Sequence, residues 1–212
     1  PEWNILIAQK KMAVGLVDLS NPENVRFARV NGNHMMYAAS LPKIAVLLSA
    51  MEEISCGNLV MDESLDRDCR AMIAKSNNQA TTRVIERIGL KNIGPILCNE
   101  KYKFYDKQDG GGLWVGKKYA KADMRIPDPL KGISHAATVR QVCRFYSMLA
   151  KDQLVNPELC TKMKQYMVNP ELHHKFVNTL DKIAPDAKIF RKSGSWRSFH
   201  SDSVLVQDDN GR

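Results

Sequence analysis

Ser40 and Lys43 are residues whose types and spacing could support nucleophilic chemistry. They are three positions apart at the start of an apolar segment, so a helix there would place both side chains on one face. A serine hydroxyl is a poor nucleophile unless a neighbour takes its proton. A lysine can do so when burial or a second cation lowers the pKa of its ammonium. The same pattern also fits a helix-capping serine beside a solvated lysine.

Two later motifs carry the same ambiguity. Residues 76–78 (Ser-Asn-Asn) fall between two expected helices, where serine and asparagine commonly cap a helix end. Residues 192–194 (Lys-Ser-Gly) fall on a strand-like segment, where glycine can mark a bulge or a close backbone approach. Neither motif alone separates a catalytic role from a structural one.

The elements that must position these motifs follow from the apolar pattern. Residues 12–19 and 25–30 read as two antiparallel strands joined by a turn-rich linker, and residues 188–191 and 201–207 give strand signals near the end. Between them, helical spacing predicts a broad buried helix from Leu41 to Gly57. Further helices are expected from Leu65 into Ser76, from Ala80 to Gly89, after the cap at Thr138, and from Asn156 to Asn169.

This order predicts an α+β fold with one antiparallel sheet built from both chain ends and an inserted helical lobe. Residues 1–39 and 183–212 would form the sheet lobe, and residues 40–182 the helical lobe. Residues 106–134 have no steady period, so we expect a long functional or disordered loop there.

Composition limits the function classes. The chain has 212 residues with 44% hydrophobic and 25% charged content, which excludes disordered, collagen-like and coiled-coil proteins. Its net charge of +8 would favour a polyanion or a carboxylate-rich substrate. No apolar run is long enough to span a membrane. The five cysteines are expected to be buried small hydrophobes, and their spacing predicts no metal site.

Together, and in this order, the three motifs resemble the S-x-x-K, S-x-N and K-[ST]-G signature of serine β-lactamases and penicillin-binding proteins, most closely the class A β-lactamases. The likeness extends over nearly the whole chain. It implies a β-lactamase/transpeptidase-like fold and a reaction through a covalent acyl-enzyme that opens a β-lactam or a related amide or ester. The implied partner is a small-molecule or peptide substrate, β-lactam or peptidoglycan-like, and no cofactor is implied. A periplasmic or secreted location is implied as well, while the oligomeric state stays unknown.

The resemblance also assigns catalytic roles. Ser40 would be the acylated nucleophile and Lys43 its proton acceptor. Ser76 would relay the proton to the leaving nitrogen, and Lys192 would be the second cation that keeps Lys43 partly neutral.

Substrate-binding roles follow in the same way. Asn78 would hydrogen-bond the amide side chain of the substrate. The backbone N–H groups of Ser40 and Ser195 would form an oxyanion hole, which requires Gly194 to leave the strand edge open. The substrate carboxylate would be held by Ser193, Lys192 and Arg197.

The interval from Ser40 to Ser76 is shorter than in class A, which implies a trimmed helical lobe. In two further respects the sequence departs from the class A pattern. It lacks the Glu-x-x-Leu-Asn segment whose glutamate activates the deacylating water; Asp106 and Asp109 are the nearest candidates for such a base, although a solvated loop carboxylate is the stronger interpretation. The chain also ends soon after Ser195, which implies that the last strand and closing helix of the family are missing. A penicillin-binding, D,D-peptidase-like protein or a non-hydrolytic β-lactam-binding protein is therefore the alternative.

Nucleic-acid binding is a third interpretation, and a weaker one. The basic residues of the irregular segment lie in a loop with few aromatic residues, which is typical of a solvated face, so we expect no nucleic-acid partner. These residues are Lys117, Lys118, Lys121 and Arg125.

Overall fold

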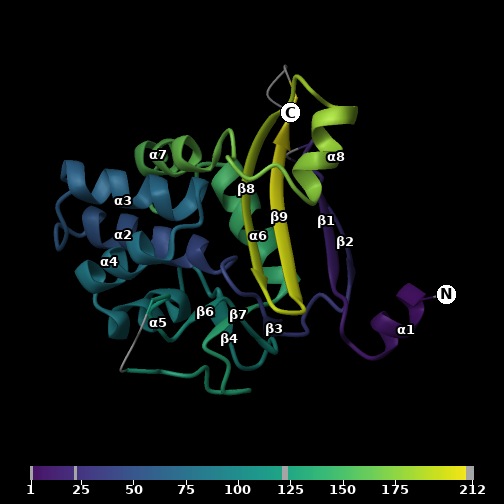
Figure 1. Cartoon of the computed structure of the whole chain (residues 1–212), viewed down its shortest axis with the longest axis horizontal. Helices are drawn as coiled ribbons and strands as arrows, with labels where there is room; N and C mark the ends of the chain where they lie inside the picture. The colour runs from purple at the N-terminus through teal and green to yellow at the C-terminus, as the bar shows by residue number, and fades with distance from the viewer. Residues whose placement is uncertain (1, 22, 121–123, 209–212) are drawn as a thin grey trace.

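Strands from the two ends of the chain stand beside helices formed by its middle (Figure 1). The structure is a computed structural model that describes residues 2–21, 23–120 and 124–208. Helices α2–α5 and α7 gather on one side of strands β8 and β9, and strands β1 and β2 stand on the other. The arrangement confirms the α+β fold class.

The first hairpin pairs β1 (Val14–Asp18) with β2 (Arg26–Val30) in antiparallel register. The second pairs β8 (Lys188–Trp196) with β9 (Phe199–Gln207), so that Lys192 lies opposite Ser203. In the described part of the chain these hairpins are separate two-stranded sheets. Helix α6 (Val139–Ala150) contacts both β1 and β9, so a helix, rather than strand pairing, joins the two ends of the chain.

The central helix is α2 (Lys43–Ser55), and its first nine residues are all buried. Around it lie α3 (Glu63–Ala74), α4 (Asn78–Ile88), α5 (Leu90–Cys98) and α7 (Pro157–Met167). The predicted caps form: Asn156 accepts a hydrogen bond from the Leu159 N–H at 2.9 Å, and Thr138 accepts one from the Gln141 N–H. Five predicted helices are therefore confirmed in position, with boundaries shifted by a few residues.

The segment expected to be an irregular loop contains several very short strands. They are β4 (Tyr105–Asp106), β5 (Gly111–Gly112) and β6 (Trp114–Val115), and β7 (His135–Ala137) follows directly after the segment. β7 pairs with β6 and with β3 (Met36–Tyr37), which leads directly to Ser40. Strands of two or three residues are too short to show a period in the sequence.

Three helices of the described ranges were not predicted: α1 (Glu2–Ala8), α5, and α8 (Phe176–Ile183), which packs against β9. None of the helices in the described ranges is long and apolar enough to cross a membrane. All five cysteines are free. Cys69 and Cys160 are buried as expected, but Cys56 and Cys98 are exposed, because they lie at or just beyond the ends of α2 and α5.

Candidate active site

Ser40 lies in the turn that leads into α2. It is partly exposed, whereas the residues immediately before and after it are buried. The preceding residue, Ala39, has a φ of 51°, in the left-handed region that costs an L-residue about 1–2 kcal/mol. Such a conformation persists only where its surroundings fix it. Here the Ala38 N–H donates to the His135 carbonyl at 2.9 Å, and the Ser201 hydroxyl donates to the Ala38 carbonyl at 2.8 Å. The backbone just before the nucleophile candidate is thus constrained by two strands, β7 and β9.

Lys43 occupies the first turn of α2 and is completely buried. Its ammonium donates to the Ser76 carbonyl at 2.6 Å and to Asn78 Oδ1 at 2.7 Å, with Ser76 Oγ 3.4 Å away. Burial lowers the pKa of Lys43 to about 7. A substantial neutral fraction near neutral pH is what a lysine needs to accept a proton.

Lys192 approaches Ser76 from the other side, on β8. Its ammonium donates to Ser76 Oγ at 2.9 Å and to the Ser193 carbonyl at 2.8 Å, and its side chain is buried. Burial, with the Lys43 charge as a second cause, holds the pKa of Lys192 well below its usual range. One hydroxyl therefore bridges two buried amines, an arrangement in which a proton can pass between them.

Ser76 and Asn78 reach this position through the turn between α3 and α4. Ser76 has a φ of 55°, and the Asn77 side chain caps α4 by accepting from the Ala80 N–H at 2.8 Å. The cap uses Asn77, which leaves the side chain of Asn78 free to contact Lys43. Asn77 thus caps the helix, and its neighbour Asn78 contacts Lys43.

Gly194 lets β8 lie directly against the turn that carries Ser40. A Cβ at Gly194 would come within 2.4 Å of the Ala38 carbonyl oxygen and 2.7 Å of the Ser40 nitrogen. Any larger residue would push the strand away from the nucleophile. The oxyanion hole assigned to the N–H groups of Ser40 and Ser195 remains a prediction.

Lys175 was missed by sequence reasoning, and it contacts the same strand. Its ammonium donates to the Gly194 carbonyl at 2.8 Å, to Ser195 Oγ at 2.9 Å and to the Ser201 carbonyl at 2.9 Å. The residue has a φ of 58° and immediately precedes α8. No motif or period marks it, because it lies in an irregular segment 17 positions before Lys192.

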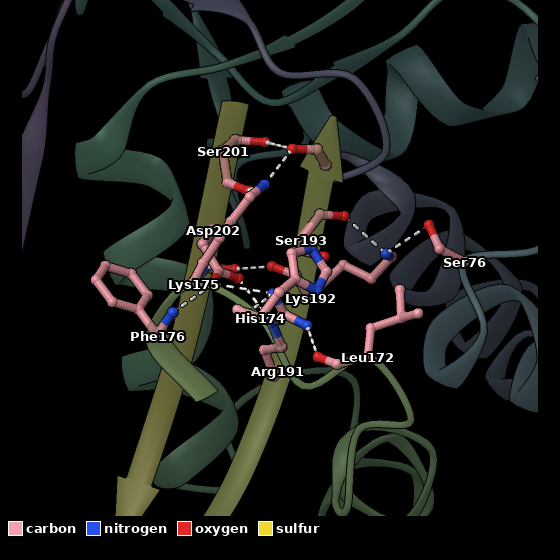
Figure 2. A network of polar contacts seen from close by, with 12 residues as sticks. Ser76, Leu172, His174, Lys175, Phe176, Arg191, Lys192, Ser193, Ser201 and Asp202 are labelled. Carbon is pink, nitrogen blue, oxygen red and sulfur yellow. Dashed lines mark hydrogen bonds and ion pairs between the residues drawn. The ribbon is translucent and has the colours of Figure 1, made fainter. Parts of the chain in front are cut away.

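A buried ion pair fixes the segment that carries Lys175 (Figure 2). Arg191 Nε donates to Asp202 Oδ1 at 2.8 Å, across the β8–β9 hairpin. The same guanidinium donates to the carbonyls of Leu172 and His174, and Asp202 accepts from the Phe176 N–H. These bonds hold the chain on both sides of Lys175.

Ser193 and Arg197, both predicted to bind the substrate carboxylate, differ in how exposed they are. Ser193 is buried, and its carbonyl accepts from Lys192. Arg197 is exposed in the turn between β8 and β9, with a φ of 50° and its guanidinium over the Trp196 ring at 5.7 Å. Lys175 is therefore tied to the β8 backbone at Gly194, whereas Arg197 lies at the end of the hairpin.

The proposed deacylation bases are engaged elsewhere. Asp106 lies in β4 and accepts from the Gln108 N–H at 2.8 Å, while Asp109 forms an ion pair with Arg140 at 2.9 Å. Within the described ranges, no carboxylate forms a hydrogen bond or ion pair with Lys43 or Lys192. Lys43 also contacts an aromatic ring: its ammonium lies 4.6 Å from the centre of the Tyr119 ring.

The basic residues of the nucleic-acid interpretation are partly neutralised. Lys118 forms an ion pair with Glu86 at 2.6 Å, and the Arg125 guanidinium bonds Ser134 and the Gly132 carbonyl. Lys121 lies outside the described residues.

Two surface hollows lie beside α5, and neither is lined by the lysine cluster. Cys98 lines both. Although Cys98 is exposed as a residue, partial burial of its thiol raises the thiol pKa, which reduces the reactive thiolate. Ser40, Lys43, Ser76 and Lys192 therefore lie outside the lining of both hollows.

Comparison with known proteins agrees with this geometry. A family described as "Beta-lactamase enzyme family" matches residues 4–68 and 64–212. No curated protein matches the chain significantly by sequence.

Solved structures share the fold at low sequence identity. A β-lactamase from Sphaerobacter thermophilus has a TM-score of 0.73 at 15% identity, over 99% of this chain and 83% of that one. An ancestral class A β-lactamase has a TM-score of 0.73 at 13% identity, over 100% and 86%. A β-lactamase from Chitinophaga pinensis has a TM-score of 0.71 at 11% identity, over 99% and 85%.

Proposed function

The chain belongs to the β-lactamase enzyme family, and from this premise we propose that it is an acyl-serine hydrolase in which Ser40 opens a β-lactam or a related amide or ester. The observation that carries the proposal is the Ser76 hydroxyl, bridged by the buried amines of Lys43 and Lys192 beside the turn of Ser40.

In the acylation step, neutral Lys43 accepts the hydroxyl proton of Ser40 as Ser40 Oγ bonds the substrate carbonyl carbon. The carbon–nitrogen bond of the substrate then breaks. Its nitrogen takes the proton of the Ser76 hydroxyl, and Ser76 is reprotonated from the lysine ammonium that it contacts. The carbonyl oxygen would be stabilised by the N–H groups of Ser40 and Ser195.

Substrate contacts follow from donors that remain free. Asn78 Oδ1 already accepts from Lys43, which leaves its Nδ2 to bind a carbonyl of the substrate. Ser195 Oγ accepts from Lys175, so its own proton is directed away from that lysine and toward a substrate carboxylate. Lys192 and Lys175 would then provide the cationic end of the site and Ser193 an uncharged contact beside them, with Arg197 at its rim.

The fate of the acyl-enzyme distinguishes two candidate functions. Within the described ranges no carboxylate bonds Lys43 or Lys192, and Asp109 is engaged by Arg140; both observations favour the second candidate, a penicillin-binding protein with slow or absent deacylation. A carboxylate that reaches the acyl-enzyme through water would favour hydrolysis. Either function uses the same acylation step. An exported location, usual for the family, belongs to this proposal.

Intact-protein mass spectrometry after incubation with penicillins and cephalosporins tests the proposal. We expect a covalent adduct on the wild type and none on Ser40→Ala. Ser49→Ala is the matched control, because Ser49 lies buried in α2 and bonds only the Ala45 carbonyl of its own helix. The decay of the adduct over time then separates a hydrolase from a penicillin-binding protein. Absence of any adduct on the folded wild type would contradict the proposal.

A further inference from the structure

Tyr119 contacts both groups that prepare Ser40 for attack. Its ring lies over the Lys43 ammonium at 4.6 Å, and its hydroxyl donates to the Ala39 carbonyl at 3.1 Å. Ala39 is the left-handed residue immediately before Ser40. A single side chain thus contacts the base on one side of the nucleophile and the constrained backbone on the other.

The ring of Tyr119 has a rigid, uncharged support. It stacks on His135 with centroids 4.1 Å apart and an angle of 21° between the planes. His135 Nε2 lies 2.9 Å from the Lys117 carbonyl, to which it donates. Burial lowers the pKa of His135 to about 4, so its ring is neutral at pH 7. A neutral ring behind Tyr119 adds no charge next to Lys43.

The segment around Tyr119 is attached to α4 at both neighbouring residues. Lys118 forms an ion pair with Glu86, and the Ala120 N–H donates to Thr82 Oγ1 at 2.9 Å. Helix α4 also carries Asn78, which binds the Lys43 ammonium. The ring and Asn78 are therefore fixed to the same helix and contact the same amine.

We propose that Tyr119 is a positioning residue of acylation, whose ring shields the Lys43 amine from water and whose hydroxyl holds the Ala39 carbonyl that precedes Ser40. This rests on the proposed roles of Ser40 and Lys43. Tyr119 itself does not exchange protons with the substrate; it acts through its two contacts.

The ring has two opposite effects on Lys43. Its π-face attracts the ammonium, which favours the charged form by about 1.5 pH units at a desolvated site such as this one. Its bulk excludes water, which disfavours the charged form by as much as several pH units. Among the described residues, the charged or titratable groups facing Lys43 are Lys192 from β8, His135 from β7 and Tyr119 itself. Neither Lys192 nor neutral His135 favours the Lys43 charge, so exclusion of water prevails.

An NMR titration of the lysine side chains, labelled with 13C at Cε, tests the effect on Lys43 without any substrate. Lys43→Arg identifies the resonance. In the wild type, Lys43 should titrate far below the surface lysines. Tyr119→Phe, which keeps the ring, should leave its midpoint within about 0.3 pH units, whereas Tyr119→Leu should raise it by about one. An unchanged midpoint in folded Tyr119→Leu would overturn the shielding role.

Acylation by a fluorescent penicillin, measured from pH 5 to 9, tests the link to function. For Tyr119→Leu, the acidic limb of the rate profile should move upward with the NMR midpoint, and a one-unit move reduces the rate at pH 7 about fivefold. Tyr119→Phe should keep the pH profile but lower its plateau, because the Ala39 carbonyl loses its donor. A wild-type plateau in Tyr119→Phe would overturn the role of the hydroxyl.

Matched controls use Tyr105, whose hydroxyl donates to Asp128 at 3.0 Å and whose ring packs on Trp114. Tyr105→Phe and Tyr105→Leu remove equivalent groups away from Lys43 and should not move its midpoint. A wild type that titrates as expected but is never acylated would contradict the proposed function and leave the shielding role supported. A shift in both the Tyr105→Leu and Tyr119→Leu variants would contradict the specific role of Tyr119.

Discussion

Two neighbouring cations on β8, Arg191 and Lys192, are both buried yet have opposite surroundings. Successive residues of a strand point to opposite faces. Arg191 meets the carboxylate of Asp202 through two hydrogen bonds and two further carbonyls from the segment before α8. Lys192 meets a hydroxyl and a carbonyl, with the Lys43 amine beyond.

The two neighbouring side chains on β8 therefore have different roles: Arg191 stabilises the fold, whereas Lys192 is proposed to take part in proton transfer. A buried charge with a carboxylate partner and a full set of acceptors stays ionised and holds the chain in place. A buried amine without a carboxylate loses its proton more easily and can take part in proton transfer. Arg191 therefore fixes the segment that carries Lys175, whereas Lys192 has the proposed role in proton transfer.

Breaking the Arg191–Asp202 ion pair should have the largest effect, and the effect should be on stability. Asp202→Ala leaves the Arg191 guanidinium buried without its counter-ion, which should reduce the free energy of unfolding by about 3–5 kcal/mol. Urea denaturation measures it. Asp181→Ala is the matched control, because Asp181 pairs with His173 on the surface and should cost less than about 1 kcal/mol. Similar losses in both variants would contradict the distinction.

Removing the base should affect chemistry far more than stability. Lys43→Ala should slow acylation by about a hundredfold or more, because proton transfer from Ser40 is then unassisted. Stopped-flow acylation with a reporter β-lactam measures the rate. Lys75→Ala, at an exposed lysine after α3, is the control and should acylate normally. Near-normal acylation of Lys43→Ala would assign the base elsewhere.

The dependence of the free energy of unfolding on pH should report the lowered pKa of Lys43. The folded pKa of Lys43 is lowered to about 7, below its unfolded value, so between these values the unfolded state binds more protons and stability rises with pH. From pH 7 to 9 the wild type should gain about 2 kcal/mol relative to Lys43→Met. Denaturation at both pH values measures this. Parallel curves for the two proteins would contradict a lowered pKa.

The smallest effects are expected from Lys175 and Arg197, the two cations near the end of β8. Lys175→Ala removes the charge beside Ser195 and should raise the KM for a carboxylate-bearing substrate about tenfold. Arg197→Ala, at the exposed turn, should raise it twofold or less. Steady-state or acylation kinetics compare them. A larger effect at Arg197 would show that the substrate lies toward the end of the hairpin.

Sequence reasoning recovered the parts of the fold that have a period or a cap. The two hairpins and the helices α2, α3, α4, α6 and α7 were predicted, and α2 was placed beside Ser40. Helix α5 was missed because Gly94 and Pro95 interrupt its pattern. The short strands that support Ser40 have two or three residues each, and only tertiary packing selects them.

The site was recoverable only as far as its motifs reached. Lys43, Ser76, Asn78 and Lys192 come together as hydrogen-bonded neighbours, as the three ordered motifs indicated. Tyr119 and Lys175 lie in irregular segments, and their positions depend on His135, on α4 and on the Arg191–Asp202 pair. Such long-range contacts leave no local signal in the sequence.

Peptide mapping of the wild type after brief exposure to a penicillin tests the central claim most directly. The account predicts that the added mass of the ring-opened penicillin is found on Ser40, while Ser76, Lys43 and Lys192 remain unmodified. An adduct on one of the two lysines, or on a peptide remote from α2, would contradict the assignment of Ser40 as the acylated nucleophile.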